Sequence, residues 1–207
     1  MLNGNKMQQL TQQSDKNSPK SYDEIFKNSK PNWQDKRRWK WLMKKYRRGS
    51  VLDLGCLFSE IPELIDENMY TGVDVAKGAV EEMQKKYFHA HYEVGDIYNL
   101  PKIIKIFPYS YVVLGEVLEH MSNPKRAVGE AWDLVRTGGT LAISVPYKEA
   151  IEPGAVDGDR HLWSFDEDDI VNMIPGKAEI KTKILGSRYF PTYKYAWKSL
   201  IVWAKKL

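Results

Sequence analysis

Cysteine and long apolar runs are almost missing from this chain of 207 residues. Its single cysteine, Cys56, excludes an internal disulfide framework and is typical of a reducing compartment. No apolar run approaches the roughly 18 residues that a membrane-spanning helix needs. Residues 1–17 are too rich in Gln, Asn and Lys to form a secretory signal. We therefore expect a cytoplasmic protein without a membrane partner.

Acidic residues are scarce at the start of the chain. Residues 1–50 hold thirteen Lys and Arg against four acids, whereas the rest of the chain holds eighteen against twenty-three. The net charge of +4 is therefore the sum of a basic N-terminal segment, residues 1–50, and a mildly acidic remainder. A hydrophobic content of 43% with seven Trp excludes general disorder.

The domain organisation is expected to be simple. Residues 1–30 show no apolar periodicity and predict a flexible polar segment. Residues 31–207 predict a single domain, since their length suffices for one ample core. Within it, residues 146–163 contain Pro146, Pro153 and two glycines, which predicts a long irregular loop.

A basic helix is expected over about residues 32–48. Its apolar residues Trp39, Leu42, Met43 and Tyr46 fall at i, i+3, i+4 and i+7. Most other positions are basic: Lys36, Arg37, Arg38, Lys40, Lys44, Lys45, Arg47 and Arg48. Two interpretations stay open, namely a packed amphipathic helix with a solvated cationic face, and a lid or basic surface for an anionic substrate such as a nucleic acid.

Strand and helix patterns alternate from residue 51 onwards. The expected strands cover residues 51–54, 69–75, 89–94, 109–114, 140–145, 178–185 and 195–204. Helical spacing follows the first, second and fourth of them, which predicts a Rossmann-like, doubly wound α/β sheet in three layers. The last two strands leave no room for a helix between them. We therefore expect seven strands, with an antiparallel C-terminal pair at the sheet edge.

Three local signals are interpreted as helix boundaries. The Asn-Pro pair at 123–124 begins a helix that runs to about Arg136. The glycine pair at 138–139 ends that helix. Ser164 and Glu167 form a capping box that opens another helix.

Carboxylates stand at the ends of three expected strands. Asp53 precedes Gly55, which predicts a tight turn into a helix, where ligands bind in open α/β sheets. Asp74 lies 19 residues past Gly55, close to the spacing at which an acid meets a ribose diol. Asp96, followed by Ile97, is interpreted either as an adenine contact or as an ordinary turn cap.

Six blocks, in order, resemble the motifs of class I S-adenosylmethionine-dependent methyltransferases. They are VLDLGC, YTGVDV, VGDIYNLP, VVLGEVLEHMSNPKRAV, RTGGTLAISVP and HLWSFDEDDI, and they cover about residues 50–175. The resemblance implies S-adenosylmethionine as cofactor and S-adenosylhomocysteine as product. The implied cofactor-binding residues are Asp53 and Gly55 at the methionine moiety, Asp74 at the ribose, Asp96 and Ile97 at the adenine, Gly115 and Glu116 beside the sulfonium, and, with no part of the cofactor assigned, Cys56, Leu57 and Val75.

The chain departs from this family at its glycine-rich turn. Members commonly have a GxGxG turn, whereas this chain has Gly55, Leu57 and Ser59 at the three positions. Glycine there permits positive φ and close approach of the backbone. Either the turn takes another path and still holds the cofactor, or cofactor binding is weakened or lost.

The block EVLEH places Glu116, Glu119 and His120 at i, i+3 and i+4, and His161 lies in the later loop. Two carboxylates and two imidazoles could bind a divalent metal, an arrangement that resembles metal-assisted O-methyltransferases. We favour a metal-free reading in which His120 is the general base, with Glu116 and His161 as further catalytic residues.

Three functions follow from these observations. The first is an enzyme that transfers a methyl group from S-adenosylmethionine to an O or N atom of a small molecule, such as a sugar or a biosynthetic intermediate. The second is an RNA methyltransferase, metal-assisted and 2'-O-directed, that uses the basic segment 33–48. The third is a non-catalytic, methyltransferase-like binding protein, which the altered turn at Leu57 would suit.

Overall fold

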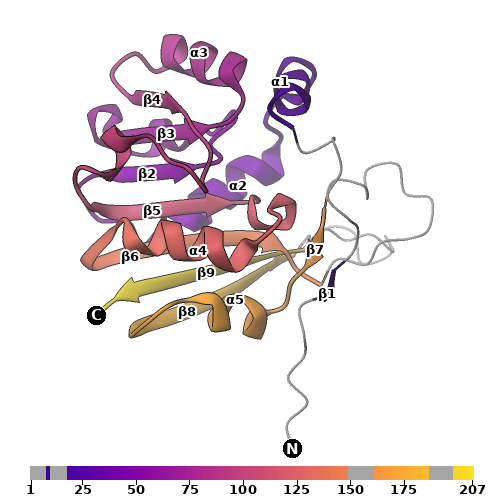
Figure 1. Cartoon of the computed structure of the whole chain (residues 1–207), viewed down its shortest axis with the longest axis vertical. Helices are drawn as coiled ribbons and strands as arrows, with labels where there is room; N and C mark the ends of the chain where they lie inside the picture. The colour runs from indigo at the N-terminus through magenta and orange to yellow at the C-terminus, as the bar shows by residue number, and fades with distance from the viewer. Residues whose placement is uncertain (1–7, 10–17, 149–160, 187–197) are drawn as a thin grey trace, which may run out of the picture.

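Seven strands form one mixed sheet at the centre of the protein (Figure 1). The computed structural model describes residues 8–9, 18–148, 161–186 and 198–207. The strands lie in the order β4 (His91–Val94), β3 (Tyr70–Asp74), β2 (Val51–Leu54), β5 (Tyr109–Gly115), β6 (Val135–Pro146), β9 (Lys198–Lys206) and β8 (Ala178–Gly186). The first five are parallel, whereas β9 is antiparallel to both β6 and β8. The predicted doubly wound sheet with an antiparallel C-terminal pair is confirmed.

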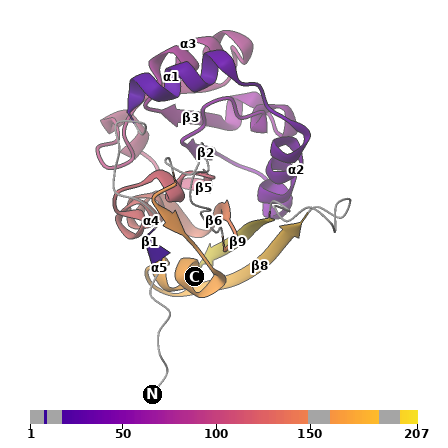
Figure 2. The ribbon, with the colours of Figure 1, turned by 90° about the vertical axis from the view of Figure 1, so that its right-hand side faces the viewer.

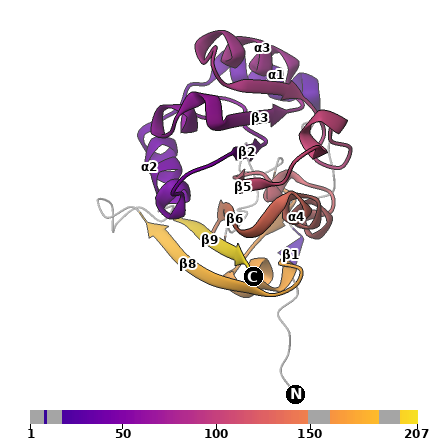
Figure 3. The ribbon, with the colours of Figure 1, turned by 90° about the vertical axis from the view of Figure 1, so that its left-hand side faces the viewer.

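Helices cover both faces of this sheet and give three layers (Figures 2 and 3). One apolar core joins the sheet to α4 (Pro124–Asp133) and α5 (Glu167–Met173). The other joins it to α2 (Trp33–Leu42) and α3 (Lys77–Lys86). All four residues of β2 are buried, as expected of a central strand covered on both faces.

The N-terminal segment differs from the expectation. Residues 1–30 were expected to lack regular structure, yet α1 spans Pro19–Asn28, with Ser18 as its N-cap. A two-residue strand, β1 (Gln8–Gln9), pairs with β7 (Trp163–Ser164). The helix forms because Ser-Pro is a good start signal and the apolar residues after it keep helical spacing, which the polar surroundings obscured. It packs on α3, and Asp23 Oδ1 accepts from the Gly78 amide at 2.7 Å.

Two expected helices are shorter in the structure. The basic helix ends as a 3-10 turn at Met43–Lys45 instead of reaching residue 48. The helix expected after Gly55 is reduced to a 3-10 turn at Ile61–Leu64. Asp66 accepts from the Asn68 amide and begins a new turn directly afterwards, so the helical path cannot continue.

Two boundary signals also act differently. The helix α4 begins at its predicted Asn123 cap but ends at Asp133, and the glycine pair at 138–139 lies inside β6. The capping box of α5 pairs Asp166 with Asp169 rather than Ser164 with Glu167.

Parts of two expected features lie outside the described residues. Residues 149–160 of the expected loop are one, and residues 195–197 of the last expected strand are the other. In the described ranges, every helix is too short or too polar to cross a membrane.

Candidate functional site

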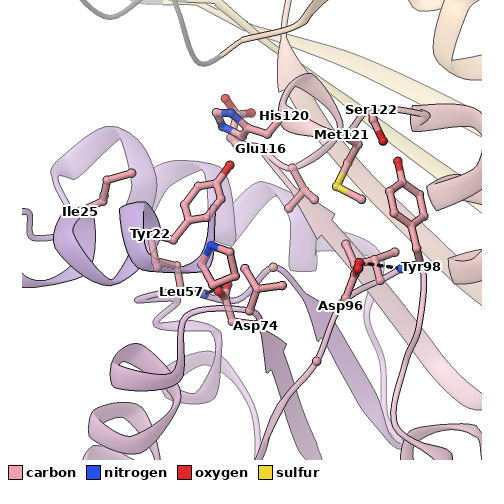
Figure 4. Close-up of a pocket in the computed structure, with 16 residues that line it drawn as sticks. Tyr22, Ile25, Leu57, Asp74, Asp96, Tyr98, Glu116, His120, Met121 and Ser122 are labelled. Carbon is pink, nitrogen blue, oxygen red and sulfur yellow. Dashed lines mark hydrogen bonds between the residues drawn. The ribbon is translucent and has the colours of Figure 1, made fainter. Parts of the chain in front are cut away.

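A cavity of about 470 Å³ opens at the carboxyl ends of the parallel strands, beneath α1 (Figure 4). Seven predicted cofactor residues line it: Gly55, Leu57, Asp74, Val75, Asp96, Ile97 and Glu116. The predicted base His120 lines it as well. Three predicted cofactor residues, Asp53, Cys56 and Gly115, do not line this cavity and lie beneath or beside its wall.

The turn at Gly55 keeps a glycine-like backbone despite its missing glycines. Gly55 has φ +77°, and an added Cβ would lie 2.5 Å from Val117 Cγ2. Leu57 has φ +33°, in the left-handed region that glycine prefers. The Leu57 amide donates to Asp74 Oδ2 at 2.9 Å. A hydrogen bond to the neighbouring Asp74 carboxylate therefore holds this turn in place. Leu57, at the position of the second glycine of the family, is left in a strained backbone conformation.

We predict that Leu57→Gly is more stable than Leu57→Ala. Both changes remove the same apolar side chain, but only glycine relieves the cost of about 1–2 kcal/mol of a left-handed residue. Thermal unfolding of the two variants should therefore show the higher Tm for Leu57→Gly. A higher Tm for Leu57→Ala would contradict the positive φ at this position.

Asp74 holds the turn and also lines the cavity. Its Oδ1 accepts from the Ala76 amide at 2.9 Å, and its Oδ2 accepts from Leu57. Burial raises the pKa of this carboxyl, opposed by the backbone hydrogen bonds. An ionised carboxylate has about four acceptor sites, so both oxygens retain capacity for hydroxyl donors in the cavity.

Asp53 does not face the cavity. It is 3% exposed, and it accepts a 2.8 Å hydrogen bond from the Tyr70 hydroxyl. Burial raises the pKa of Asp53 to about 6, against the lowering effect of its hydrogen bonds with Ser59 and Tyr70. This buried carboxyl supports the turn from below.

The raised pKa of Asp53 has a stability consequence. The folded state holds the proton up to about pH 6, whereas the unfolded state loses it near pH 3.8, so stability falls as the pH rises between these values. We predict that Asp53→Asn reduces this loss, so that the variant gains Tm relative to the native chain at pH 7 but not at pH 4. An equal change in Tm at both pH values would contradict the raised pKa of Asp53.

The Asp96 side chain caps a turn, as one of the two interpretations predicted, and the residue also lines the cavity. Its Oδ1 accepts from the Tyr98 amide at 2.9 Å, and Asn99 N donates to its carbonyl at 2.8 Å. Ile97 next to it is 6% exposed and belongs to the core.

Glu116 stands at the end of β5 with φ +57°. Its Oε1 accepts from the Ser199 hydroxyl at 2.8 Å and lies 3.9 Å from Arg38 Nε. Arg38 is 8% exposed and also donates to Asp35 at 2.9 Å. Strain at a residue that is held by several neighbours is a common feature of functional sites.

The structure brings Glu119, His120 and His161 together. Ligand atoms of the three lie within 4.8 Å of one another, and the two imidazole centroids are 4.8 Å apart. Glu119 is 1% exposed, and burial followed by the nearby Glu116 charge raises its pKa. The Leu162 amide donates to the Glu119 carbonyl at 2.6 Å, which fixes the His161 segment beside the 3-10 turn Leu118–His120. This set has the composition of a metal site, but Glu116, also considered as a ligand, lies outside it.

Residues of α1 are the main feature that the sequence did not predict. Pro19, Tyr22 and Ile25 line the cavity. The Tyr22 ring packs edge-on against His120, with centroids 6.0 Å apart (Figure 4). The helical spacing of Tyr22 and Ile25 with Phe26 is the signal that would have revealed the helix, although not its place over the cavity.

Comparison with known proteins agrees with this geometry. Residues 52–143 match the family described as methyltransferase domain. The N-methyltransferase NodS of Bradyrhizobium japonicum WM9, solved with S-adenosyl-L-homocysteine, is 12% identical with a TM-score of 0.68, over 92% of this chain and 98% of that one. A search of curated proteins finds no match to this chain.

Two further solved structures show the same fold. The [4+2]-cyclase SpnF is 18% identical with a TM-score of 0.64, over 86% of this chain and 84% of that one. The N-terminal domain of EvdMO1, solved with SAH and D-fucose, is 11% identical with a TM-score of 0.61, over 86% of this chain and 85% of that one. Residues 52–143 are thus similar to a methyltransferase domain, and the chain has the Rossmann-like fold of these solved structures.

Proposed function

We propose that the protein is an S-adenosylmethionine-dependent methyltransferase acting on a small-molecule acceptor. The observation that carries the proposal is Asp74, whose carboxylate ends β3 at the cavity while holding the Leu57 amide. The match of residues 52–143 to a methyltransferase family, and a structural neighbour solved with S-adenosyl-L-homocysteine, support the choice of cofactor.

The cavity suits this cofactor in size and chemistry. A volume of about 470 Å³ lies within the range of small-molecule sites. In our assignment Asp74 and Val75 hold the ribose, Asp96 and Ile97 the adenine, and Gly55 with Leu57 the methionine moiety. Glu116 lies at the sulfonium end, where a fixed negative charge favours a cation. Asp53, Cys56 and Gly115 support this wall from behind.

When bound, the cofactor supplies an activated methyl group on a sulfonium. The chain mainly has to align the acceptor atom with that methyl, which is where most of the acceleration of such a transfer arises. His120 lines the cavity beside Tyr22 and 4.8 Å from the His161 ring centroid. We assign His120 as the base that takes the acceptor's proton, with His161 as its partner. The Glu116 carboxylate contributes negative charge to the same cavity.

Replacing His120 tests this assignment. We predict that His120→Asn lowers kcat by about 100-fold or more, the usual contribution of a general base. Cofactor affinity should stay within about threefold, and the loss should be smaller at high pH, where the acceptor ionises without help. The assay follows transfer of a labelled methyl group to a panel of small hydroxyl and amine acceptors. An unchanged kcat with a normal pH profile would refute the role of His120.

A metal-assisted variant of the reaction has one observation in its favour. Glu119 Oε2 is buried and makes no hydrogen bond among the described residues, and it shares its cluster with two imidazoles. Full activity after chelation would leave the metal-free mechanism, whereas activity restored only by a divalent ion would establish the metal.

Two of the solved structures bear on the acceptor class. The EvdMO1 domain was solved in the presence of SAH and D-fucose, which supports a sugar as one candidate acceptor. The cyclase SpnF has the same fold, so the fold alone does not fix the reaction. A non-catalytic binding function would follow if the cofactor bound without any transfer to the acceptor panel.

A further inference from the structure

The basic helix uses several of its charges inside the protein. Lys36 lies 2.8 Å from Glu60, and Arg37 donates to the Gly186 carbonyl at 3.0 Å. Arg38 is buried between Asp35 and Glu116. The first part of α2 therefore serves the fold and the site instead of presenting a free cationic stripe.

The later lysines of this segment meet a second set of cations on the sheet. Lys44 Nζ lies 4.0 Å from the centroid of the Trp41 ring, and Lys183 Nζ of β8 lies 5.8 Å from the same centroid. Lys45 Nζ lies 5.9 Å from the Trp203 ring of β9. The tryptophans thus hold ammonium groups from different elements close together, at a favourable cation–π distance.

Two more lysines extend this surface along the edge of the sheet. Lys181 pairs in register with Trp203, and Lys205 pairs with Glu179. The pKa of Glu179 is lowered first by Lys181, and then also by Lys205 and Lys45, so these charges gather around one carboxylate. We call this set the α2–β8 basic face; it comprises Lys44, Lys45, Lys181, Lys183 and Lys205. Figures 2 and 3 both show α2 beside the end of β8.

The surroundings of the α2–β8 basic face favour a nucleic acid over a membrane. Binding to a membrane surface usually adds apolar side chains that insert between lipids. Of the described residues, Ile103, Ile106 and Phe107 are exposed in one segment, which lies in sequence between β4 and β5, and β6 and β9 separate β5 from β8 in the sheet. Two exposed apolar side chains stand nearer, Trp33 at the first residue of α2 and Leu207 after β9, but they are single residues from separate elements. Ile184 on β8 alternates with Lys183 and so faces the other side of the sheet.

We propose that the α2–β8 basic face binds the phosphate backbone of a nucleic-acid strand without reading its bases. A strand offers one phosphate at each nucleotide, so it can engage several ammonium groups at once. The tryptophan rings already contact lysines, so they serve to position charge. This proposal does not depend on the methyltransferase reaction, although Arg38 on the same helix reaches Glu116 at the site.

The test measures binding of a fluorescein-labelled RNA of about 20 nucleotides, and of DNA of the same sequence, between about 50 and 200 mM salt. The test variant changes Lys44, Lys183 and Lys205 to Gln. The matched control changes three other exposed lysines, Lys85, Lys102 and Lys125, to Gln, so both variants lose the same charge. A third variant places Arg at the three test positions. Circular dichroism and S-adenosylhomocysteine binding confirm that each variant is folded.

We expect the test variant to lose about tenfold or more in affinity at low salt, and its slope of log K against log salt to fall by about 2. The control should keep most of the affinity, and the Arg variant should bind as the native chain does, even if the Gln variant fails to fold. Equal losses in test and control, or no binding at low salt, would overturn the proposal. So would tighter binding to phosphatidylserine vesicles than to either oligonucleotide.

Discussion

Replacing Asp74 by Ala is expected to weaken S-adenosylmethionine binding by about 100-fold or more. The change removes a carboxylate that we assign to the ribose hydroxyls, and hydrogen bonds to a charged group contribute about 1.5–3 kcal/mol each. It also removes the acceptor of the Leu57 amide, so the turn that flanks the cofactor loses its anchor. Calorimetric titration with S-adenosylhomocysteine measures the effect without knowledge of the acceptor.

Asp74→Asn is the matched variant for this experiment. An amide has one oxygen and cannot accept from both Ala76 and Leu57 while facing two hydroxyls. We expect its affinity to fall between the native chain and Asp74→Ala. Native affinity in Asp74→Ala, with a native Tm, would remove Asp74 from the cofactor site.

Gly55→Ala is expected to disrupt the turn and abolish cofactor binding. Gly55 has φ +77°, and its new Cβ would meet Val117 Cγ2 at 2.5 Å, which is too close for any real contact. Left-handed strain alone costs about 1–2 kcal/mol, and the clash adds to it. Thermal unfolding should show a clear fall in Tm, and S-adenosylhomocysteine should no longer raise it.

Gly129→Ala provides the control for this substitution. Gly129 lies inside α4, and nothing lies within 4 Å of a Cβ added there. Alanine in a helix interior is favoured over glycine by up to about 1 kcal/mol, so this variant should be as stable as the native chain or more so. Equal changes in Tm in the two alanine variants would contradict the requirement for glycine at position 55.

The fold was largely predictable because its signals are local and repeated. Each buried parallel strand is a short apolar run, as in Val51 to Leu54, and helical spacing follows β3 and β5, where α3 and α4 form. The predictions that were wrong concern segments whose structure depends on tertiary contacts. The glycine pair at 138–139 resembles a helix end, but it lies within β6, at a shift of register between two paired positions. Val135 pairs with Tyr109 of β5 before the glycines, and Thr140 pairs with Tyr111 of β5 and Lys205 of β9 after them.

The candidate site was only partly predictable. Strand ends converge at one edge of a parallel sheet, so Asp74 could be placed there from its spacing, whereas Asp96 was placed there by the resemblance of its sequence block; both residues line the cavity. The wall formed by α1 could not be placed, because the sequence does not show that a polar N-terminal helix folds back over the sheet. The sequence also left the backbone conformation of the turn at Leu57 undecided. Only the φ of +33° and the hydrogen bond to Asp74 show that this leucine adopts a glycine-like conformation.

The central claim is that the cavity beneath α1 binds S-adenosylmethionine despite the altered turn. Calorimetric titration of the native chain with S-adenosylhomocysteine tests it most directly. We predict one binding site per chain with a dissociation constant in the micromolar range, about −8 kcal/mol, and a matching rise in Tm. No heat and no thermal shift at millimolar ligand would contradict the assignment of this cavity as a cofactor site.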